Sequence, residues 1–254
     1  MATPDREIRL VQITDTHLFA DPSQRMRGLD TAQTLRQVVT HVRRHYADAA
    51  ACLLTGDLSH DGQAGSYRLL REILGALKMP LLALPGNHDN KTLMAQMLDD
   101  RRWRYCPVFD IGPWRILNLD SVVEDAEHGC LDDAQLELTR KALDSPRRHA
   151  LVCLHHPPLA IGSRWLDRIG LTNCAEFLEA VDHSGGVRGV LWGHIHQEFS
   201  ERRNGVSLWG TPSTCVQFVP RVDRFAVDSR APGYRVLDLR KDGTLGSHVE
   251  RVGD

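Results

Sequence analysis

Two pairs of acidic and imidazole side chains have a spacing that suits metal binding. Asp15 and His17 are two residues apart, and so are His194 and His196. Residues two apart in extended backbone point the same way, so each pair can face one cavity. Nitrogen and oxygen ligands without thiolate suit manganese, iron, zinc or cobalt, whereas magnesium and calcium prefer more oxygen ligands. These pairs therefore predict a transition-metal site, and the residue types alone do not choose among the four metals.

The candidate ligands all follow predicted strands. Strands are predicted at 8–13, 51–55, 81–84, 150–154 and 187–192. In the same order, the polar residues that follow these strands are Asp15 with His17, then Asp57, then Asn87 to Asp89, then His155 with His156, and last His194 with His196. The carboxyl ends of strands in α/β sheets form the crevice where ligands bind, so these loops are expected to converge. Glycines at 56, 86 and 193 precede polar residues, which suits sharp turns and close backbone approach.

The expected charges favour phosphate chemistry. Asp57 stands alone in its loop and at the centre of the chain order, and we assign it as a carboxylate that bridges two cations about 3.5 to 4 Å apart. Two divalent ions carry four positive charges, of which Asp15 and Asp57 cancel two. The site would therefore stay positive and attract an anionic phosphodiester. Water held between the ions would lose a proton near neutral pH, and the resulting hydroxide is the expected nucleophile.

Alternating strand and helix patterns predict a layered α/β fold. Helical periodicity appears at 31–46, 64–77, 132–143 and 173–182, with Asp30 as the N-cap of the first helix, and a further strand is predicted at 114–119. After Trp192 the helices stop, and short runs at 206–209, 215–219 and 234–239 are interpreted as antiparallel strands that close the sheet.

Composition indicates one domain, 1–254, without a nucleic-acid partner. The 254 residues are 42% hydrophobic, enough for one substantial core. The 31 basic and 33 acidic residues give a net charge of −2, so nucleic acid is not an expected partner. No secretory signal or bilayer-spanning run is apparent, and the six cysteines form no C-x-x-C pair. We therefore expect a cytoplasmic protein that does not enter a membrane, with buried reduced thiols.

The motifs resemble those of a known superfamily. D-T-H (15–17), G-D (56–57), G-N-H-D (86–89), H-H-P-P (155–158) and G-H-I-H (193–196) occur in the order found in calcineurin-like metallophosphoesterases. The segments 12–20, 165–167, 193–198 and 211–218 narrow the resemblance to class III cyclic-nucleotide phosphodiesterases, and to the bacterial cyclic AMP phosphodiesterases in particular. These segments span nearly the whole chain. The residues Asp89-Asn90-Lys91 after the G-N-H element argue against a protein phosphatase.

The resemblance implies a fold, a ligand set and a reaction. The implied fold is a β-sandwich flanked by helices in a single domain. One metal would be bound by Asp15, His17, Asp57 and His196, and the other by Asp57, Asn87, His155 and His194. The family often pairs iron with manganese. His88 and Asn87 are the implied catalytic residues, with His88 protonating the departing 3′ oxygen or orienting the phosphoryl group. His17, Asp57, Asn87, His88 and His196 are implied to contact the substrate. The implied reaction is attack of hydroxide on 3′,5′-cyclic AMP, which gives 5′-AMP.

Several residues keep two interpretations at this point. His156 either supports a metal ligand or turns away from the site. The segment 162–173 either covers the substrate, with Trp165 on the base and Arg164 or Asn173 near phosphate, or is an ordinary surface loop. The remaining histidines that we considered are interpreted as structural or surface residues: His41, His45, His60, His149, His183 and His248.

Two alternatives to a cyclic AMP phosphodiesterase follow from the same residues. The first is a broader phosphodiesterase that acts on glycerophosphodiesters or 2′,3′-cyclic nucleotides. The second is a metal-binding scaffold without catalysis, whose signature would be loss of ligands. No candidate ligand is missing from the sequence, which favours an enzyme. The sequence does not choose between cyclic AMP and cyclic GMP and does not give the oligomeric state.

Overall fold

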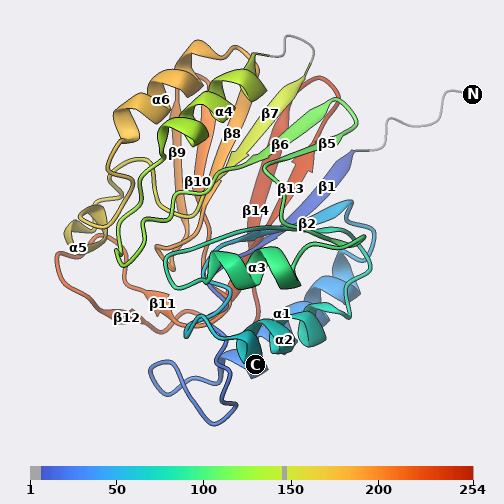
Figure 1. The fold of residues 1–254 in the computed structure, drawn as a ribbon, viewed down its shortest axis with the longest axis vertical. Helices are drawn as coiled ribbons and strands as arrows, with labels where there is room; N and C mark the ends of the chain where they lie inside the picture. The colour runs from blue at the N-terminus through green and yellow to red at the C-terminus, as the bar shows by residue number, and fades with distance from the viewer. Residues whose placement is uncertain (1–6, 145–147, 254) are drawn as a thin grey trace, which may run out of the picture.

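Two β-sheets stacked face to face form the centre of the molecule (Figure 1). The computed structural model describes residues 7–144 and 148–253, and all statements below concern these residues. The first sheet has the strand order β14 (Leu245–Arg251), β13 (Gly233–Leu239), β1 (Ile8–Ile13), β2 (Ala51–Thr55), β3 (Leu81–Leu84) and β4 (Trp103–Arg104). The second has the order β5 (Val108–Ile111), β6 (Trp114–Asn118), β7 (His149–Cys153), β8 (Val187–Trp192), β10 (Val206–Gly210) and β9 (Phe199–Arg203).

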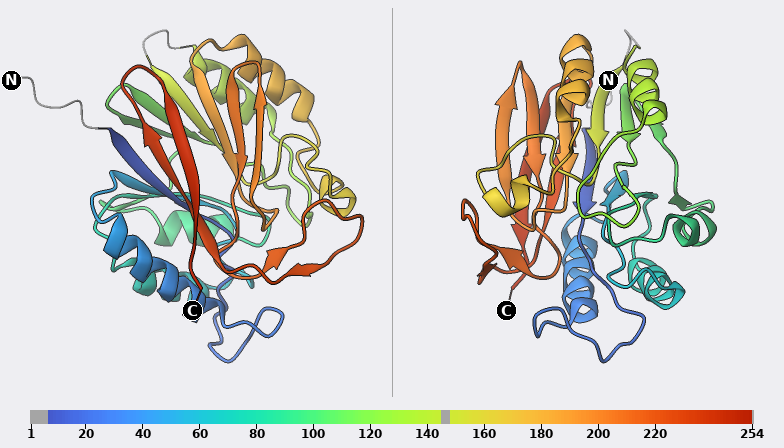
Figure 2. Two further views of the ribbon diagram at one scale, coloured as in Figure 1. Left: turned by 180° about the vertical axis from the view of Figure 1, so that it is seen from behind. Right: turned by 60° about the vertical axis from the view of Figure 1, so that its left-hand side comes forward.

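Helices cover the outer face of each sheet (Figures 1 and 2). On the first sheet these are α1 (Thr31–His45), α2 (Ala64–Leu74) and α3 (Lys91–Met97), and on the second α4 (Asp133–Leu143) and α6 (Cys174–His183). The short helix α5 (Arg164–Asp167) lies beyond the second sheet. The Asp30 side chain accepts a hydrogen bond from the Gln33 backbone nitrogen, which confirms Asp30 as the N-cap of α1.

Three apolar layers hold this arrangement together. Residues of both sheets, such as Leu53 and Leu151, pack between the sheets, and each outer layer joins one sheet to its helices. Strands buried on both faces read as continuous apolar runs rather than as alternating ones. The predicted layered fold and β-sandwich are thus confirmed.

The parallel strands of both sheets end at one edge of the sandwich. In the first sheet β1, β2 and β3 are mutually parallel, and in the second β6, β7 and β8 are parallel. The loops after β1, β2, β3, β7 and β8 carry every candidate ligand. The site therefore lies across the seam between the sheets and takes residues from both.

The prediction for the C-terminal strands was only partly correct. β13 pairs antiparallel with β1 as expected, but β10 runs parallel to β8 and antiparallel to β9. The segment 215–219 does not close either sheet. Its strand β11 (Gln217–Phe218) pairs only with β12 (Val227–Asp228), because the preceding residues turn toward the ligand loops: the Thr214 backbone nitrogen bonds the Thr14 carbonyl at 3.2 Å.

Candidate metal centre

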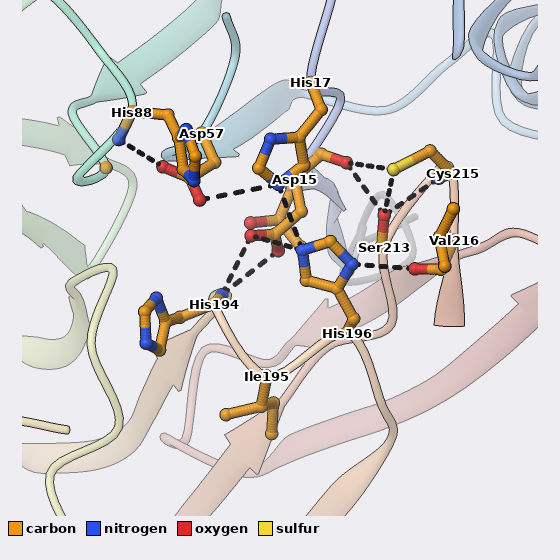
Figure 3. Close-up of polar contacts among 12 residues, drawn as sticks. Asp15, His17, Asp57, His88, His194, Ile195, His196, Ser213, Cys215 and Val216 are labelled. Carbon is orange, nitrogen blue, oxygen red and sulfur yellow. Dashed lines mark hydrogen bonds and ion pairs between the residues drawn. The ribbon is translucent and has the colours of Figure 1, made fainter. Parts of the chain in front are cut away.

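Backbone hydrogen bonds hold the ligand loops against one another. The Asp15 nitrogen donates to the Gly56 carbonyl at 3.0 Å, and the His17 nitrogen donates to the Asp57 carbonyl at 2.9 Å. The His194 nitrogen donates to both carboxylate oxygens of Asp15, at 3.0 and 3.1 Å, which links the second sheet to the first (Figure 3). The positions of these side chains are therefore fixed by main-chain contacts.

Five candidate ligands have left-handed backbone conformations. The φ angles are 53° at Asp15, 42° at His17, 50° at Asp57, 66° at His194 and 47° at His196. The left-handed conformation lowers the free energy of unfolding by roughly 1–3 kcal/mol for a residue that has a Cβ, and such residues cluster at functional sites. Because five strained residues share one site, the fold gives up stability there to aim these side chains inward.

The three glycines noted in the sequence are needed for close packing at the site. A Cβ at Gly56 would lie 2.4 Å from His155 Nδ1, and one at Gly193 would lie 2.1 Å from Thr14 Oγ1. At Gly86 it would lie 2.3 Å from both the backbone nitrogen and Oδ1 of Asp57. Any side chain at these positions would displace a candidate ligand or its neighbour, so the prediction of close backbone approach is confirmed.

Asp15, His17 and His196 form one group of candidate ligands. The Nε2 atoms of His17 and His196 are 3.1 Å apart, and His196 Nε2 is 3.5 Å from Asp15 Oδ1 (Figure 3). His196 Nδ1 donates to the Val216 carbonyl at 2.7 Å, which leaves the Nε2 of a neutral ring as a lone pair facing inward. The ligand atoms of Asp15, His17 and His196 lie within 4.8 Å of one another, and two imidazole nitrogens with a carboxylate oxygen form a donor set that suits a transition metal.

Asn87, His155 and His194 form a second group. His194 Nδ1 lies 3.1 Å from Asn87 Oδ1 and 3.3 Å from His155 Nε2. His155 Nδ1 donates to the Thr55 carbonyl at 2.9 Å, which directs its Nε2 inward as at His196. An amide oxygen and two imidazoles thus converge on one point, as a metal-binding group requires.

Asp57 lies between the two groups. Its Oδ2 is 3.5 Å from His17 Nε2 and 3.3 Å from His155 Nε2, while Oδ1 accepts a hydrogen bond from the His88 nitrogen at 3.0 Å. The ligand atoms of Asp15, Asp57 and His155 also lie within 4.8 Å of one another. Asp57 has the position that a bridging carboxylate would need.

The pKa values reflect a dense set of charges away from water. Burial opposes charge on both Asp57 and His155, but their mutual attraction prevails: the pKa of Asp57 is held well below its usual range and that of His155 is raised to about 9. Burial lowers the pKa of His194 to about 3 and that of His17 well below 6.5. His17 and His194 are therefore neutral at pH 7, as ligands must be.

Asp89 joins two of the ligand loops through the hydrogen bonds of its carboxylate. Its carboxylate accepts backbone hydrogen bonds from Leu58, Ser59 and Gly86 and one from the Tyr67 hydroxyl, all between 2.9 and 3.1 Å. Burial and the nearby negative charge of Asp57 raise its pKa to about 6. The sequence placed Asp89 in the G-N-H-D motif, but it did not predict that Asp89 links the two loops.

Two further histidines lie at the site: His156, which kept two interpretations in the sequence analysis, and His60, which was given no role there. His156 is fully buried, contacts the rings of His155 and His194, and shares a 2.8 Å hydrogen bond between its Nδ1 and Ser121 Oγ. His60, interpreted from the sequence as structural or surface, has its Nδ1 3.1 Å from His17 Nδ1. Its ring also stacks on His88 at 4.7 Å. No strand-end pattern marked His60, because it comes three residues after Asp57 within the same loop.

The segment 162–173 makes packing contacts that favour the structural interpretation of two of its residues. Trp165 packs edge-on against Phe218 and Phe225 at centroid distances of 5.2 and 5.3 Å. The Asn173 side chain accepts from the Leu131 nitrogen and donates to the Leu131 carbonyl. Arg164 is exposed. None of these contacts involves a candidate ligand.

Fold and site together define a phosphoesterase. A model of the calcineurin-like phosphoesterase family matches residues 8–198, and the chain belongs to this family. It is 42% identical to the 3′,5′-cyclic adenosine monophosphate phosphodiesterase CpdA of Pseudomonas aeruginosa, over 98% of this chain and 92% of that protein. The protein of the same name in Escherichia coli strain K12 is 40% identical with the same coverage of both chains.

Solved structures support the fold. A dimetal phosphatase from Danio rerio superposes with a TM-score of 0.66 at 15% identity, covering 97% of this chain and 99% of that one. The purple acid phosphatase PPD1 of yellow lupin gives 0.68 at 13% identity, covering 98% and 52%. Among the described residues, no helix has both the length and the apolar character to cross a membrane.

Proposed function

We propose that this protein hydrolyses 3′,5′-cyclic AMP to 5′-AMP at a centre of two divalent metals. The observation that carries the proposal is the position of Asp57 between two groups of inward-facing ligand atoms. The choice of substrate rests on the relatives that are named cyclic AMP phosphodiesterases at about 40% identity over nearly the whole chain.

The donor set fits a pair of divalent transition metals. Asp15, His17, Asp57 and His196 would hold one ion, and Asp57, Asn87, His155 and His194 the other. Iron and manganese are the proposed pair, with zinc or cobalt as chemically suitable replacements. When bound, such ions would lower the pKa of water and neutralise charge on a phosphoryl group.

The protein itself would orient the phosphate and supply a proton. The His88 backbone nitrogen donates a hydrogen bond to Asp57 Oδ1 at 3.0 Å. His88 therefore lies next to Asp57, the carboxylate between the two groups of candidate ligands. Opening the cyclic diester breaks the bond between phosphorus and the 3′ oxygen, and that oxygen must take up a proton. We assign this proton to His88, and we assign substrate contacts to His17, Asp57, Asn87, His88 and His196.

A cytoplasmic location is part of the proposal. All six cysteines are free in the structure, and three of them, Cys52, Cys153 and Cys215, are buried. Unpaired thiols in the core suit a reducing compartment. A cyclic nucleotide would be the small-molecule partner.

Product analysis tests this function. Purified protein supplied with manganese and iron should convert cyclic AMP to 5′-AMP, and a chelator or the substitution Asp57→Asn should abolish turnover. Failure with cyclic AMP beside rapid hydrolysis of a glycerophosphodiester or a 2′,3′-cyclic nucleotide would favour the broader phosphodiesterase. A protein that binds metal but hydrolyses no diester would be a scaffold, and chelator-resistant turnover would contradict the metal-dependent reaction.

A further inference from the structure

His60 contacts both a candidate metal ligand and the candidate proton donor. It lies in the loop between β2 and α2, where its backbone nitrogen donates to the Leu18 carbonyl at 2.8 Å. The Phe19 ring packs against its imidazole at a centroid distance of 4.6 Å. These contacts hold the His60 ring against both His17 and His88, whose rings also contact each other at a centroid distance of 4.9 Å.

The contact with His17 decides which nitrogen of His17 carries the proton. His17 Nε2 faces Asp57 and His196, so this atom must be unprotonated to bind a cation. The proton then sits on Nδ1, whose partner is His60 Nδ1 at 3.1 Å. Metal-binding histidines usually donate this second N–H to a carboxylate, a backbone carbonyl or water, which fixes ring and tautomer.

The other two histidines with a fixed Nδ1 follow that rule. His155 donates to the Thr55 carbonyl and His196 donates to the Val216 carbonyl. At His17 the corresponding acceptor is an imidazole instead. His60 thus takes the place that a main-chain carbonyl has at the other two ligands, and it must be neutral with its own proton on Nε2.

The contacts with His88 fix that ring in two ways. The His60 carbonyl lies 3.2 Å from His88 Nδ1, and the two rings stack with centroids 4.7 Å apart and planes 19° apart. The carbonyl accepts the Nδ1 proton and turns His88 Nε2 away from it. The stacked ring restricts rotation of His88 about its side-chain bonds.

We propose that His60 is a positioning residue that holds His17 in its metal-binding tautomer through Nδ1 and holds the His88 ring in place by stacking. The inference rests on the proposed metal centre and on His88 as the proton donor. It assigns two separable roles to one side chain, and two substitutions can remove them one at a time.

His60→Asn keeps an acceptor and removes the ring, because Asn Oδ1 occupies nearly the place of His Nδ1. His60→Phe keeps a stacking ring and removes the acceptor. The exposed His45 on α1 provides the control variant His45→Asn, since it lies outside the site. Circular dichroism and thermal unfolding of the metal-free variants check the fold.

Metal affinity and turnover are then measured separately. Affinity is measured by titrating metal-free protein with manganese. Turnover is measured with 3′,5′-cyclic AMP, whose 3′ oxygen must take up a proton, across a range of manganese concentrations. For His60→Phe we expect metal binding about 10- to 100-fold weaker, with turnover largely recovered at saturating metal. For His60→Asn we expect metal affinity near that of the unchanged protein and kcat lowered about tenfold. This loss is smaller than the whole contribution of a proton donor, because His88 is still present and only its position is less well fixed.

Two results would overturn the inference. One is a folded His60→Phe protein that binds manganese as tightly as the His45→Asn control. The other is a His60→Asn protein that loses as much affinity as His60→Phe, since the retained acceptor would then be irrelevant. The metal titration needs no substrate, so inactivity toward cyclic AMP would refute the proposed function while leaving this test intact.

Discussion

Replacing Gly86 by alanine would place a methyl group against Asp57. The new Cβ would lie 2.3 Å from the Asp57 backbone nitrogen, 2.3 Å from Oδ1 and 2.9 Å from Cγ. Real Cβ atoms essentially never come closer than 3.0 Å to another heavy atom, so the distance must grow from 2.3 to 3.0 Å. Asp57 or the 86–89 loop must therefore move by about 0.7 Å. The φ angle of Gly86 is not in the left-handed region, so the effect is one of space alone.

A shift of this size is large for a bridging ligand. Overpacking of a tight site costs about 1–3 kcal/mol of folding free energy, which a domain of this size can bear. A misplacement near 1 Å at a catalytic centre can lower the rate about 10²-fold. We expect Gly86→Ala to fold, to bind manganese about 10- to 100-fold more weakly and to lose about 10²-fold in kcat/KM.

Gly185→Ala is the matched control. Gly185 also lies outside the left-handed region, and a Cβ there would meet no heavy atom within 4 Å. Its effect on stability should stay within about 0.5 kcal/mol, with metal affinity and activity unchanged. Elemental analysis, thermal unfolding and diester hydrolysis of both variants complete the experiment. Full metal content and full activity in Gly86→Ala would refute the placement of Asp57 at the centre.

Three further predictions concern single residues of the site. Asn87→Ala should lower activity by orders of magnitude without unfolding the protein, because one metal loses a ligand; a fully active variant would exclude Asn87 as a ligand. His88→Ala should lower turnover and keep both metals by elemental analysis, whereas metal loss would make His88 structural. His155 has a pKa raised to about 9 and is protonated in the metal-free protein at pH 7. Metal binding should therefore release about one proton there, and affinity should rise with pH until about pH 9. Calorimetry in buffers of different ionisation enthalpy measures this release, and affinity that falls as pH rises would contradict it.

The central, buried strands could be predicted from the sequence, whereas several edge strands and a short helix could not. The bounds of β1, β2, β3 and β8 match the predicted strands, because each is rich in apolar residues and most of its residues are buried. The edge strand β9 reads Phe-Ser-Glu-Arg-Arg with four exposed residues, so no apolar pattern marks it. β5 and β14 are likewise mostly half-buried or exposed, and the seven-residue helix α3 is too short for a clear periodicity.

The candidate ligands could be found in the sequence because each follows a strand, often directly after a glycine. The role of His60 could not, since it depends on how the loop after β2 folds back onto His17 and His88. The position of 215–219 was misjudged for a related reason: this apolar run packs under the ligand loops, and the Phe218 ring stacks on His196 at 4.2 Å instead of extending a sheet. Both errors concern contacts between segments that local patterns do not encode.

Anomalous diffraction from crystals grown with manganese tests the central claim most directly. We expect two peaks about 3.5 to 4 Å apart on either side of the Asp57 carboxylate, one beside His17 and His196 and the other beside His155 and His194. Absence of both peaks at saturating manganese, or a single peak away from Asp57, would contradict a shared carboxylate between two cations.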